Sequence, residues 1–206
     1  MNPESFLSNF RGSGHLVVFF VYLQKLIEMK RLFLPILTLF FALTSLYSQV
    51  NNFGVTENGK AYWQKVYNID IPREDILNNI INNGNFVDIN DGDVITFRIY
   101  RGKLDVTDFG YSRGSVPIYV TTYDVSCFVT VQIKDGRYRV TADNIILVQN
   151  VTNALGKEGE EEPIETWAVK RGQISNGFSK SPSEVYDAFF TKLFQFQKKT
   201  YLDDEW

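Results

Sequence analysis

The strongest constraint on the fold is a long stretch of alternating polar and apolar residues in the second half of the chain. Residues 118–133 alternate throughout, and residues 137–148 alternate again after Asp135 and Gly136. Successive side chains of a β-strand point to opposite faces, and an Asp-Gly pair between two such runs is typical of a tight hairpin turn. The pattern therefore predicts two long antiparallel strands, each with one buried face.

The rest of the chain adds shorter strands and two helices. Pro72 suits the first turn of a helix over 73–82, and Ser181, Pro182 and Glu184 form the start signal of a second helix over 182–200. Residues 102–116 and 150–163 are predicted loops, and the further predicted strands are 61–71, 86–89, 94–101 and 164–170. This order predicts an α+β fold, in which a curved antiparallel β-sheet has two helices packed on one face.

Residues 29–48 have the order of a secretory signal peptide. Lys30 and Arg31 precede an apolar run, and small and polar residues follow as far as Ser48. The run is shorter than the roughly 20 residues that span a bilayer, so cleavage is favoured over the alternative of an uncleaved anchor. The predicted organisation is a mis-set start or extra segment (1–28), a signal peptide (29–48), a polar tether (49–60) and a single α+β domain (61–206).

Residue types exclude several chemistries from the exported part of the chain. The single histidine, His15, precedes the predicted cleavage site, which removes histidine-based triads and zinc motifs. The single cysteine, Cys127, is in phase with Val125 and Val129 and is predicted to be a core residue. Neither a cofactor nor a metal is predicted, because the acidic run 88–93 is better interpreted as a hairpin turn than as a calcium loop.

Charge argues against a nucleic-acid partner. The whole chain has a net charge of −3, and the part after residue 48 is more acidic still, because residues 1–48 hold more basic than acidic side chains. Nucleic-acid binding requires clustered positive charge.

Arginines and tyrosines on the predicted strands and in the 102–116 loop are the candidate binding residues. Aromatics between glycines also make this loop a candidate recognition loop, or a lid over the core. Simple exposure of strand positions is the alternative explanation for the arginines at 98, 137 and 139. The candidate surface for a ligand or partner is Arg98, Tyr100, Arg101, Tyr111, Arg113, Arg137 and Arg139, with Tyr119 beside them.

Short motifs resemble a known family. Residues 62–67 (YWQKVY), the Ile71-Pro72 helix start and residues 134–140 (KDGRYRV) are similar to those of the exported bacterial domain-of-unknown-function family 4468. The resemblance implies a TBP-like fold, which is a curved antiparallel sheet with helices across one face. It implies no activity and no site residues, and DNA binding does not follow from a shape.

The leading functional hypothesis is a non-enzymatic binding or interaction module, exported to the periplasm or beyond the cell, for an unidentified envelope protein or ligand. A hydrolase that works through two carboxylates is the first alternative, because such chemistry needs no histidine. The available residues are Asp88, Asp93, Asp105, Asp108 and Asp124. The second alternative is a membrane-anchored accessory subunit that touches the membrane only through an uncleaved 29–48 segment.

Overall fold

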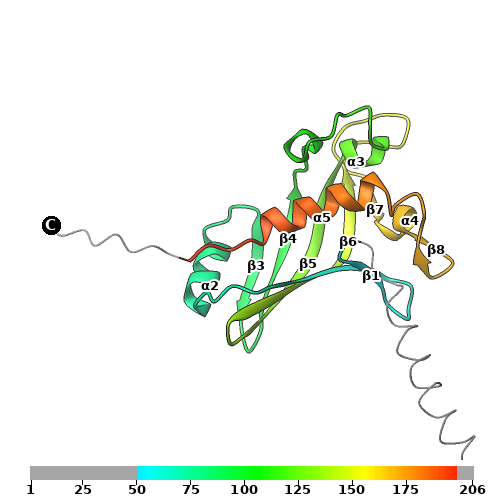
Figure 1. The fold of residues 1–206 in the computed structure, drawn as a ribbon. Coiled ribbons are helices and arrows are strands. Elements are labelled where there is room, and N and C mark those ends of the chain that lie inside the picture. The colour runs from blue at the N-terminus through cyan, green and yellow to red at the C-terminus, as the bar shows by residue number, and fades with distance from the viewer. Residues whose placement is uncertain (1–50, 199–206) are drawn as a thin grey trace, which may run out of the picture. The chain divides into compact units, whose positions relative to one another are not determined.

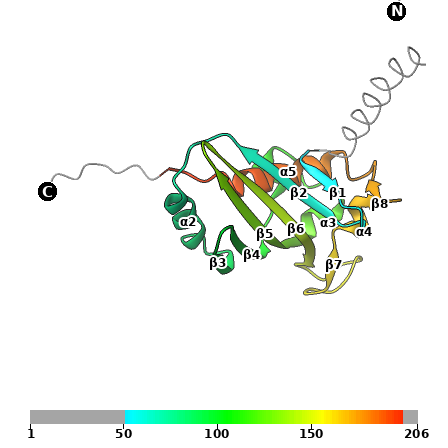
Figure 2. The same cartoon turned by 90° about the horizontal axis from the view of Figure 1, so that it is seen from below.

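The computed structural model describes residues 51–198, which form an α+β unit (Figures 1 and 2). Within this range, seven antiparallel strands make one sheet in the order β1-β2-β6-β5-β4-β3, with β7 also paired to β6. The strands are β1 (Phe53–Val55), β2 (Ala61–Tyr67), β3 (Phe86–Asp91), β4 (Ile95–Gly102), β5 (Tyr123–Lys134), β6 (Arg137–Gln149) and β7 (Glu161–Pro163). A separate small hairpin joins β8 (Val169–Lys170) to β9 (Gln173–Ile174).

Helix α5 lies across one face of the sheet (Figure 1). The helices are α2 (Arg73–Ile81), α3 (Ile118–Thr122), α4 (Glu165–Ala168) and α5 (Ser181–Leu193), with a 3-10 turn η2 (Val106–Phe109). The α+β class and both predicted helices are confirmed, and α3 and α4 are additional. The predicted signal peptide and the segment before it lie outside the described residues. Within residues 51–198, none of the helices has the length and apolar character needed to cross a bilayer.

The predicted long hairpin is the centre of the sheet. Strands β5 and β6 pair from their turn outward, with Val131 opposite Val140 and Val129 opposite Ala142. All four of these side chains are fully buried. Gly136 occupies the turn with φ 71°, a conformation that glycine adopts without steric cost.

The hairpin begins later than predicted, because residues 118–122 form α3 instead of the first part of a strand. Tyr119 and Val120 are both buried although they are adjacent, which a strand with one exposed face does not allow. The hydroxyls of Thr121 and Thr122 both donate to the Ile118 carbonyl at 2.9 Å, which satisfies the backbone of this short turn. Local hydrogen bonding and burial therefore override the β propensity of the segment.

Part of the predicted polar tether belongs to the sheet. Residues 53–55 form β1 against β2, and Phe53 is fully buried. Gly54 lies opposite Tyr62, whose ring occupies the space that a β-carbon at Gly54 would take. A strand of three residues is too short to show alternation of buried and exposed positions. The sequence pattern therefore does not predict β1 within this polar segment.

The predicted edge strand at 164–170 is wrong in its first part. Ile164 is buried and its carbonyl accepts from the Trp167 and Ala168 amides, so α4 forms there. The edge strand is instead β7, within the predicted loop, and its register places Glu161 opposite Val148. Charged residues are typical of sheet edges, because they discourage pairing with other chains.

Helix α5 is shorter than predicted and begins one residue earlier. Lys180 is the N-cap without a side-chain cap bond, so Ser181, which was part of the predicted start signal, lies inside the helix and does not cap it. The helix ends at Leu193, where the Tyr138 hydroxyl replaces helical hydrogen bonds of the backbone. This hydroxyl donates to the Phe194 carbonyl at 2.9 Å and accepts from the Phe196 amide at 3.1 Å. The chain after the helix therefore stays against the sheet.

Three bulges bend the sheet. Asp88, Arg101 and Asn144 each have a positive φ, of 53°, 50° and 46°. Each lies where the register of its strand pair shifts. A bulge increases local twist and bends a strand, so these positions account for the predicted curvature.

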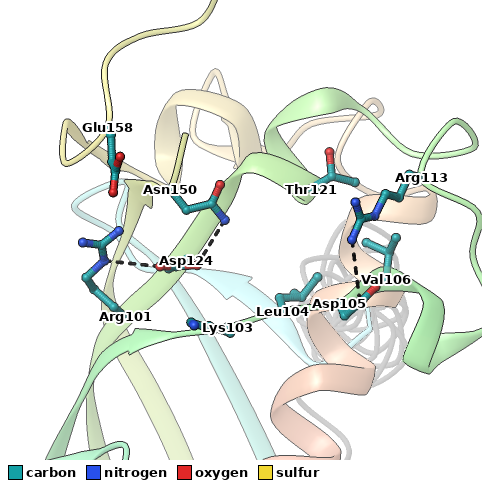
Figure 3. A pocket seen from close by; sticks show the side chains of 10 residues that line it. All are labelled: Arg101, Lys103, Leu104, Asp105, Val106, Arg113, Thr121, Asp124, Asn150 and Glu158. Carbon is teal, nitrogen blue, oxygen red and sulfur yellow. Dashed lines mark hydrogen bonds and ion pairs between the residues drawn. The ribbon is translucent and has the colours of Figure 1, made fainter. Parts of the chain in front are cut away.

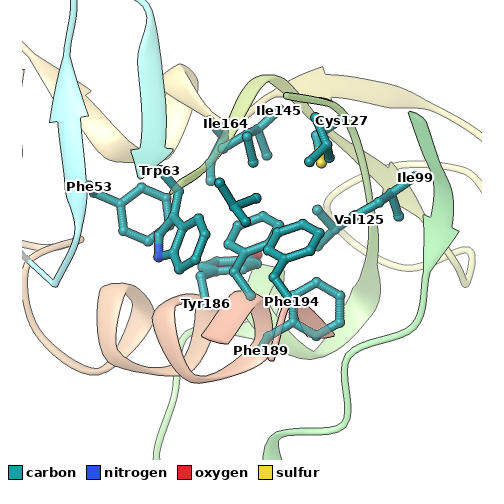
Figure 4. Close-up of a cluster of buried hydrophobic side chains, with 14 of the residues drawn as sticks. Phe53, Trp63, Ile99, Val125, Cys127, Ile145, Ile164, Tyr186, Phe189 and Phe194 are labelled. Carbon is teal, nitrogen blue, oxygen red and sulfur yellow. The ribbon is translucent and has the colours of Figure 1, made fainter. Parts of the chain in front are cut away.

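Aromatic side chains fill the space between the sheet and α5 (Figure 4). Trp63 of β2 lies 5.3 Å from Phe190 between ring centroids, and Phe53 lies 5.1 Å from Phe178. The Trp63 indole N–H donates to the Asp187 carboxylate at 2.7 Å, which joins β2 to α5. The aromatic side chains of α5 thus form the second layer of the core.

Cys127 is a core residue, as predicted, and this has a direct chemical test. Its side chain is in the buried cluster, and burial raises the pKa of the thiol. We expect iodoacetamide at pH 8 to leave the native protein unmodified and to alkylate it fully in denaturant, since only the thiolate reacts. The intact mass of the protein reports the extent of alkylation in the native and in the denatured state. Rapid alkylation of the native protein would show that the thiol is accessible.

Candidate functional site

A polar pocket of about 660 Å³ lies at the end of the sheet where β4 leaves it (Figure 3). Its walls come from the end of β4, the 102–116 loop, α3, the start of β5 and the segment after β6. We call this cavity the loop pocket. Its volume is in the range of small-molecule sites in proteins.

The bulge in β4 turns Arg101 into the loop pocket. Phe97 and Ile99 point into the core, and regular alternation would send residue 101 there too. The positive φ of Arg101 shifts the strand by one residue, so Gly102 takes the inward position instead. A β-carbon at Gly102 would lie 2.9 Å from Ile99 Cγ2 and 3.3 Å from the Phe189 ring, so a residue without a side chain fits this inward position.

Asp124 holds the Arg101 side chain in place. One of its carboxylate oxygens accepts from Arg101 Nε at 3.2 Å, and the other accepts from Asn150 Nδ2 at 3.1 Å. The Asp124 side chain is only 6% exposed, whereas that of Arg101 is 33% exposed. Because Nε makes the bond, the two terminal nitrogens of Arg101 keep their donors for a ligand.

A second pair of opposite charges lies at the other end of the loop pocket. Arg113 Nη2 is 3.8 Å from an Asp105 carboxylate oxygen, and both side chains are largely exposed. Hydrogen bonds from the Thr107 amide and hydroxyl, with a smaller effect of Arg113, lower the pKa of Asp105. Figure 3 shows this pair well away from Arg101, across Leu104.

Two further charges in the loop pocket have no charged partner within residues 51–198. They are the ammonium of Lys103 and the carboxylate of Glu158, both on exposed residues. Figure 3 shows the Glu158 carboxylate on the same side of the pocket as the Arg101 guanidinium. The pocket therefore offers both signs of charge to a ligand.

The loop that forms the pocket is fastened to α5. The Tyr111 hydroxyl donates to Glu184, which raises the pKa of Tyr111, and Lys192 lies 3.5 Å from an Asp108 carboxylate oxygen. The same lysine lies over the Phe109 ring at 5.7 Å. These contacts fix the wall of a preformed pocket.

Two carboxylates of the loop pocket, those of Asp105 and Asp124, lack the features of a glycosidase-type general acid. Asp105 and Asp124 are two of the five aspartates considered for a hydrolase. A glycosidase-type general acid needs a raised pKa, but that of Asp105 is lowered. Both oxygens of Asp124 already accept hydrogen bonds. Among the described residues, no group of three histidine, cysteine or acidic side chains is placed to hold a metal.

The structure brings together only two of the seven predicted binding residues, Arg101 and Arg113, in the loop pocket. Arg98 and Tyr100 lie on the exposed outer face of β4, where Arg98 is 3.7 Å from Asp88. The Tyr111 hydroxyl donates to Glu184 of α5, and Tyr111 does not line the loop pocket. The position of Arg98 fits the alternative interpretation, in which this arginine simply occupies an exposed strand position.

Arg137 and Arg139 line a different cavity of about 500 Å³ beside the β5–β6 turn. Arg139 Nε donates to Gln132 Oε1 at 2.9 Å across the hairpin. Tyr119 is a core residue: it stacks on Trp167 at 4.5 Å, and burial raises its pKa to about 12. These residues are thus separate from the loop pocket.

Sequence reasoning missed Lys103, Asn150 and Glu158 as pocket residues. Asn150 begins the predicted 150–163 loop, and in the structure its side chain donates to Asp124. Glu158 belongs to a predicted solvated loop. The available signal was Asp124 itself, a carboxylate between apolar residues at the start of a strand.

The fold defines an α+β protein with a curved antiparallel sheet, and solved structures resemble it. A TBP-like protein from Parabacteroides distasonis ATCC 8503 has 15% sequence identity, with a TM-score of 0.45 over 68% of this chain and 90% of that one. A DUF4468 family protein from Bacteroides ovatus ATCC 8483 also has 15% identity, with a TM-score of 0.39 over 71% and 93%. The second is from the family that the sequence motifs resemble. No family model and no curated protein matches the chain.

Proposed function

We propose that the chain is an exported, non-enzymatic binding module of the bacterial cell envelope, and that the loop pocket is its binding site. The observation that carries the proposal is the Arg101 side chain, which a strand bulge aims into the pocket and Asp124 holds there. A charged group fixed before the ligand arrives loses little side-chain entropy on binding. The signal-like segment at 29–48 is the support for export.

Geometry and charge support binding in preference to turnover. The pocket is preformed, because its loop is fastened to α5 by Tyr111 and Lys192. Its guanidinium groups suit carboxylate or phosphate groups of a small ligand. Its carboxylates lack the separated acid and base roles that hydrolysis requires.

The test is native mass spectrometry of the chain purified from the envelope fraction of its own cells. We expect a chain that begins at Gln49 and carries an extra bound mass. Arg101→Gln and Lys103→Met should each lose that mass, because both remove a cation from the pocket. The matched control is Arg137→Gln, which removes an exposed arginine from the other cavity and should retain it.

Each alternative outcome is informative. A chain that still includes residues 29–48 would show an anchored protein and contradict cleavage after Ser48. An extra mass that survives Arg101→Gln and Lys103→Met would place the ligand outside the loop pocket. Lys103 is exposed, so its loss is not expected to affect folding, and it keeps the test valid if Arg101→Gln fails to fold.

A further inference from the structure

We infer that the ligand of the loop pocket is an α-amino acid, recognised through both of its charged groups. This inference rests on the proposed function, since it names the ligand class of the same pocket. Its starting point is the distinction between charges that already have partners and charges that do not. Asp124 and Asp105 have arginine partners, whereas Lys103 and Glu158 have none among the described residues.

The carboxylate of the amino acid would bind at Arg101. Arg101 uses Nε for Asp124, so its two terminal nitrogens are free to donate in parallel to both oxygens of one carboxylate. Lys103 lines the same pocket and adds a second cation. An anion alone would satisfy these two groups.

Glu158 is the reason that an anion alone does not fit. Its carboxylate lies on the side of the pocket where the Arg101 guanidinium lies (Figure 3), so a simple anion at Arg101 would meet a like charge. An ammonium group beside the bound carboxylate converts that repulsion into attraction. The α-carbon of an amino acid carries both a carboxylate and an ammonium group, which suits a pocket with a guanidinium and a carboxylate on the same side (Figure 3).

The rest of the pocket has room for a side chain. From Arg101 the cavity continues past Leu104 to the exposed pair of Arg113 and Asp105, with Val106 beside that pair (Figure 3). An apolar section followed by a polar end tolerates several kinds of side chain. The pocket would therefore select its ligand mainly through the carboxylate and the ammonium group that are bonded to the α-carbon.

The test is isothermal titration calorimetry with the chain in the form that its cells accumulate, after removal of any bound mass. The protein amino acids are titrated in both enantiomeric forms, and the tightest binder is compared with its N-acetyl and its amide derivatives. We expect each derivative to bind at least about tenfold more weakly, which is the size expected for a lost hydrogen bond to a charged group.

Two variants separate the two charges. Glu158→Gln should weaken the free amino acid about tenfold, because it removes the partner of the ammonium, but should strengthen binding of the N-acetyl derivative, because that derivative is an anion and no longer meets a like charge. Lys103→Met should weaken the free amino acid and the N-acetyl derivative but leave the amide unchanged. Glu57→Gln, an exposed glutamate outside the pocket, is the matched control and should bind like the wild type.

The outcomes distinguish this inference from the proposed function. Equal binding of the N-acetyl derivative, or no effect of Glu158→Gln, would show an anion-only site and overturn the amino-acid inference. The absence of binding by every amino acid would overturn it too. In either case, a native bound mass that is lost with Lys103→Met would leave the loop pocket standing as a binding site.

Discussion

Replacement of Phe194 by alanine is expected to lower the free energy of unfolding by about 3–5 kcal/mol. The Phe194 ring is fully buried where the end of α5 meets the sheet (Figure 4). Its centroid lies 5.7 Å from that of Trp63, 6.2 Å from that of Phe97 and 5.9 Å from that of Phe190. These neighbours belong to β2, β4 and α5, so the cavity left by alanine would have rigid walls on three elements and little chance to collapse.

Urea unfolding followed by tryptophan fluorescence measures this loss, and Phe128→Ala is the matched control. Phe128 undergoes the same chemical change, but its side chain is on the outer face of β5 and 37% exposed. We expect the control to lose less than about 1.5 kcal/mol, because much of its ring already contacts water. Similar losses for both variants would contradict the assignment of inner and outer faces.

The two faces of the central hairpin were predictable because alternation records burial directly. Val129, Val131 and Val140 are fully buried, as their phase indicates. Helix α5 was predictable for the same reason, since its aromatic residues recur on one side. In a strand or helix that is long enough to show several periods, the spacing of apolar residues predicts which side chains are buried.

Short elements and element ends were not predictable in this way. Residues 118–122 alternate like a strand, yet Tyr119 and Val120 are buried together in α3. The end of α5 depends on the Tyr138 hydroxyl, which lies far away in the sequence and takes the backbone groups after Leu193. Contacts between distant segments decide such boundaries, and a local pattern does not contain them.

The loop pocket escaped sequence analysis because a change of backbone conformation creates it. Alternation along β4 gives no sign that Arg101 adopts a positive φ, which an arginine rarely does. Without that bulge, Arg101 would be one of several arginines at strand positions. The seven predicted residues were chosen because they are arginines and tyrosines. Only Arg101 and Arg113 among them line the loop pocket, because the backbone places them there.

Asp124→Asn is expected to lower the free energy of unfolding by about 2 kcal/mol. The two carboxylate oxygens of Asp124 accept one hydrogen bond each, from Arg101 and from Asn150. An asparagine keeps the shape but has no charge and one acceptor oxygen fewer, so the charge-assisted bond from Arg101 is lost even if the Asn150 amide turns to accept from the new NH2. The site is nearly closed to water, with the Asp124 side chain 6% exposed, and water can therefore not restore the lost bond.

Asp105→Asn is the matched control, because it makes the same change at the opposite end of the loop pocket. Asparagine can still accept from the Thr107 amide, and the ion pair with Arg113 is exposed, so the loss should stay below about 0.5 kcal/mol. Thermal unfolding by circular dichroism measures both variants, and an equal loss would contradict the special position of Asp124.

The Asp124→Asn variant also links stability to binding. Each Asp124 oxygen already accepts a hydrogen bond and the side chain is only 6% exposed, so we expect its effect on binding to pass mainly through the orientation of Arg101. We therefore expect weaker binding of the native bound mass while Lys103 and Glu158 are unchanged. Loss of stability with undiminished binding would show that Arg101 needs no partner to reach its ligand, and that the pair with Asp124 serves only to hold the ends of β4 and β5 together.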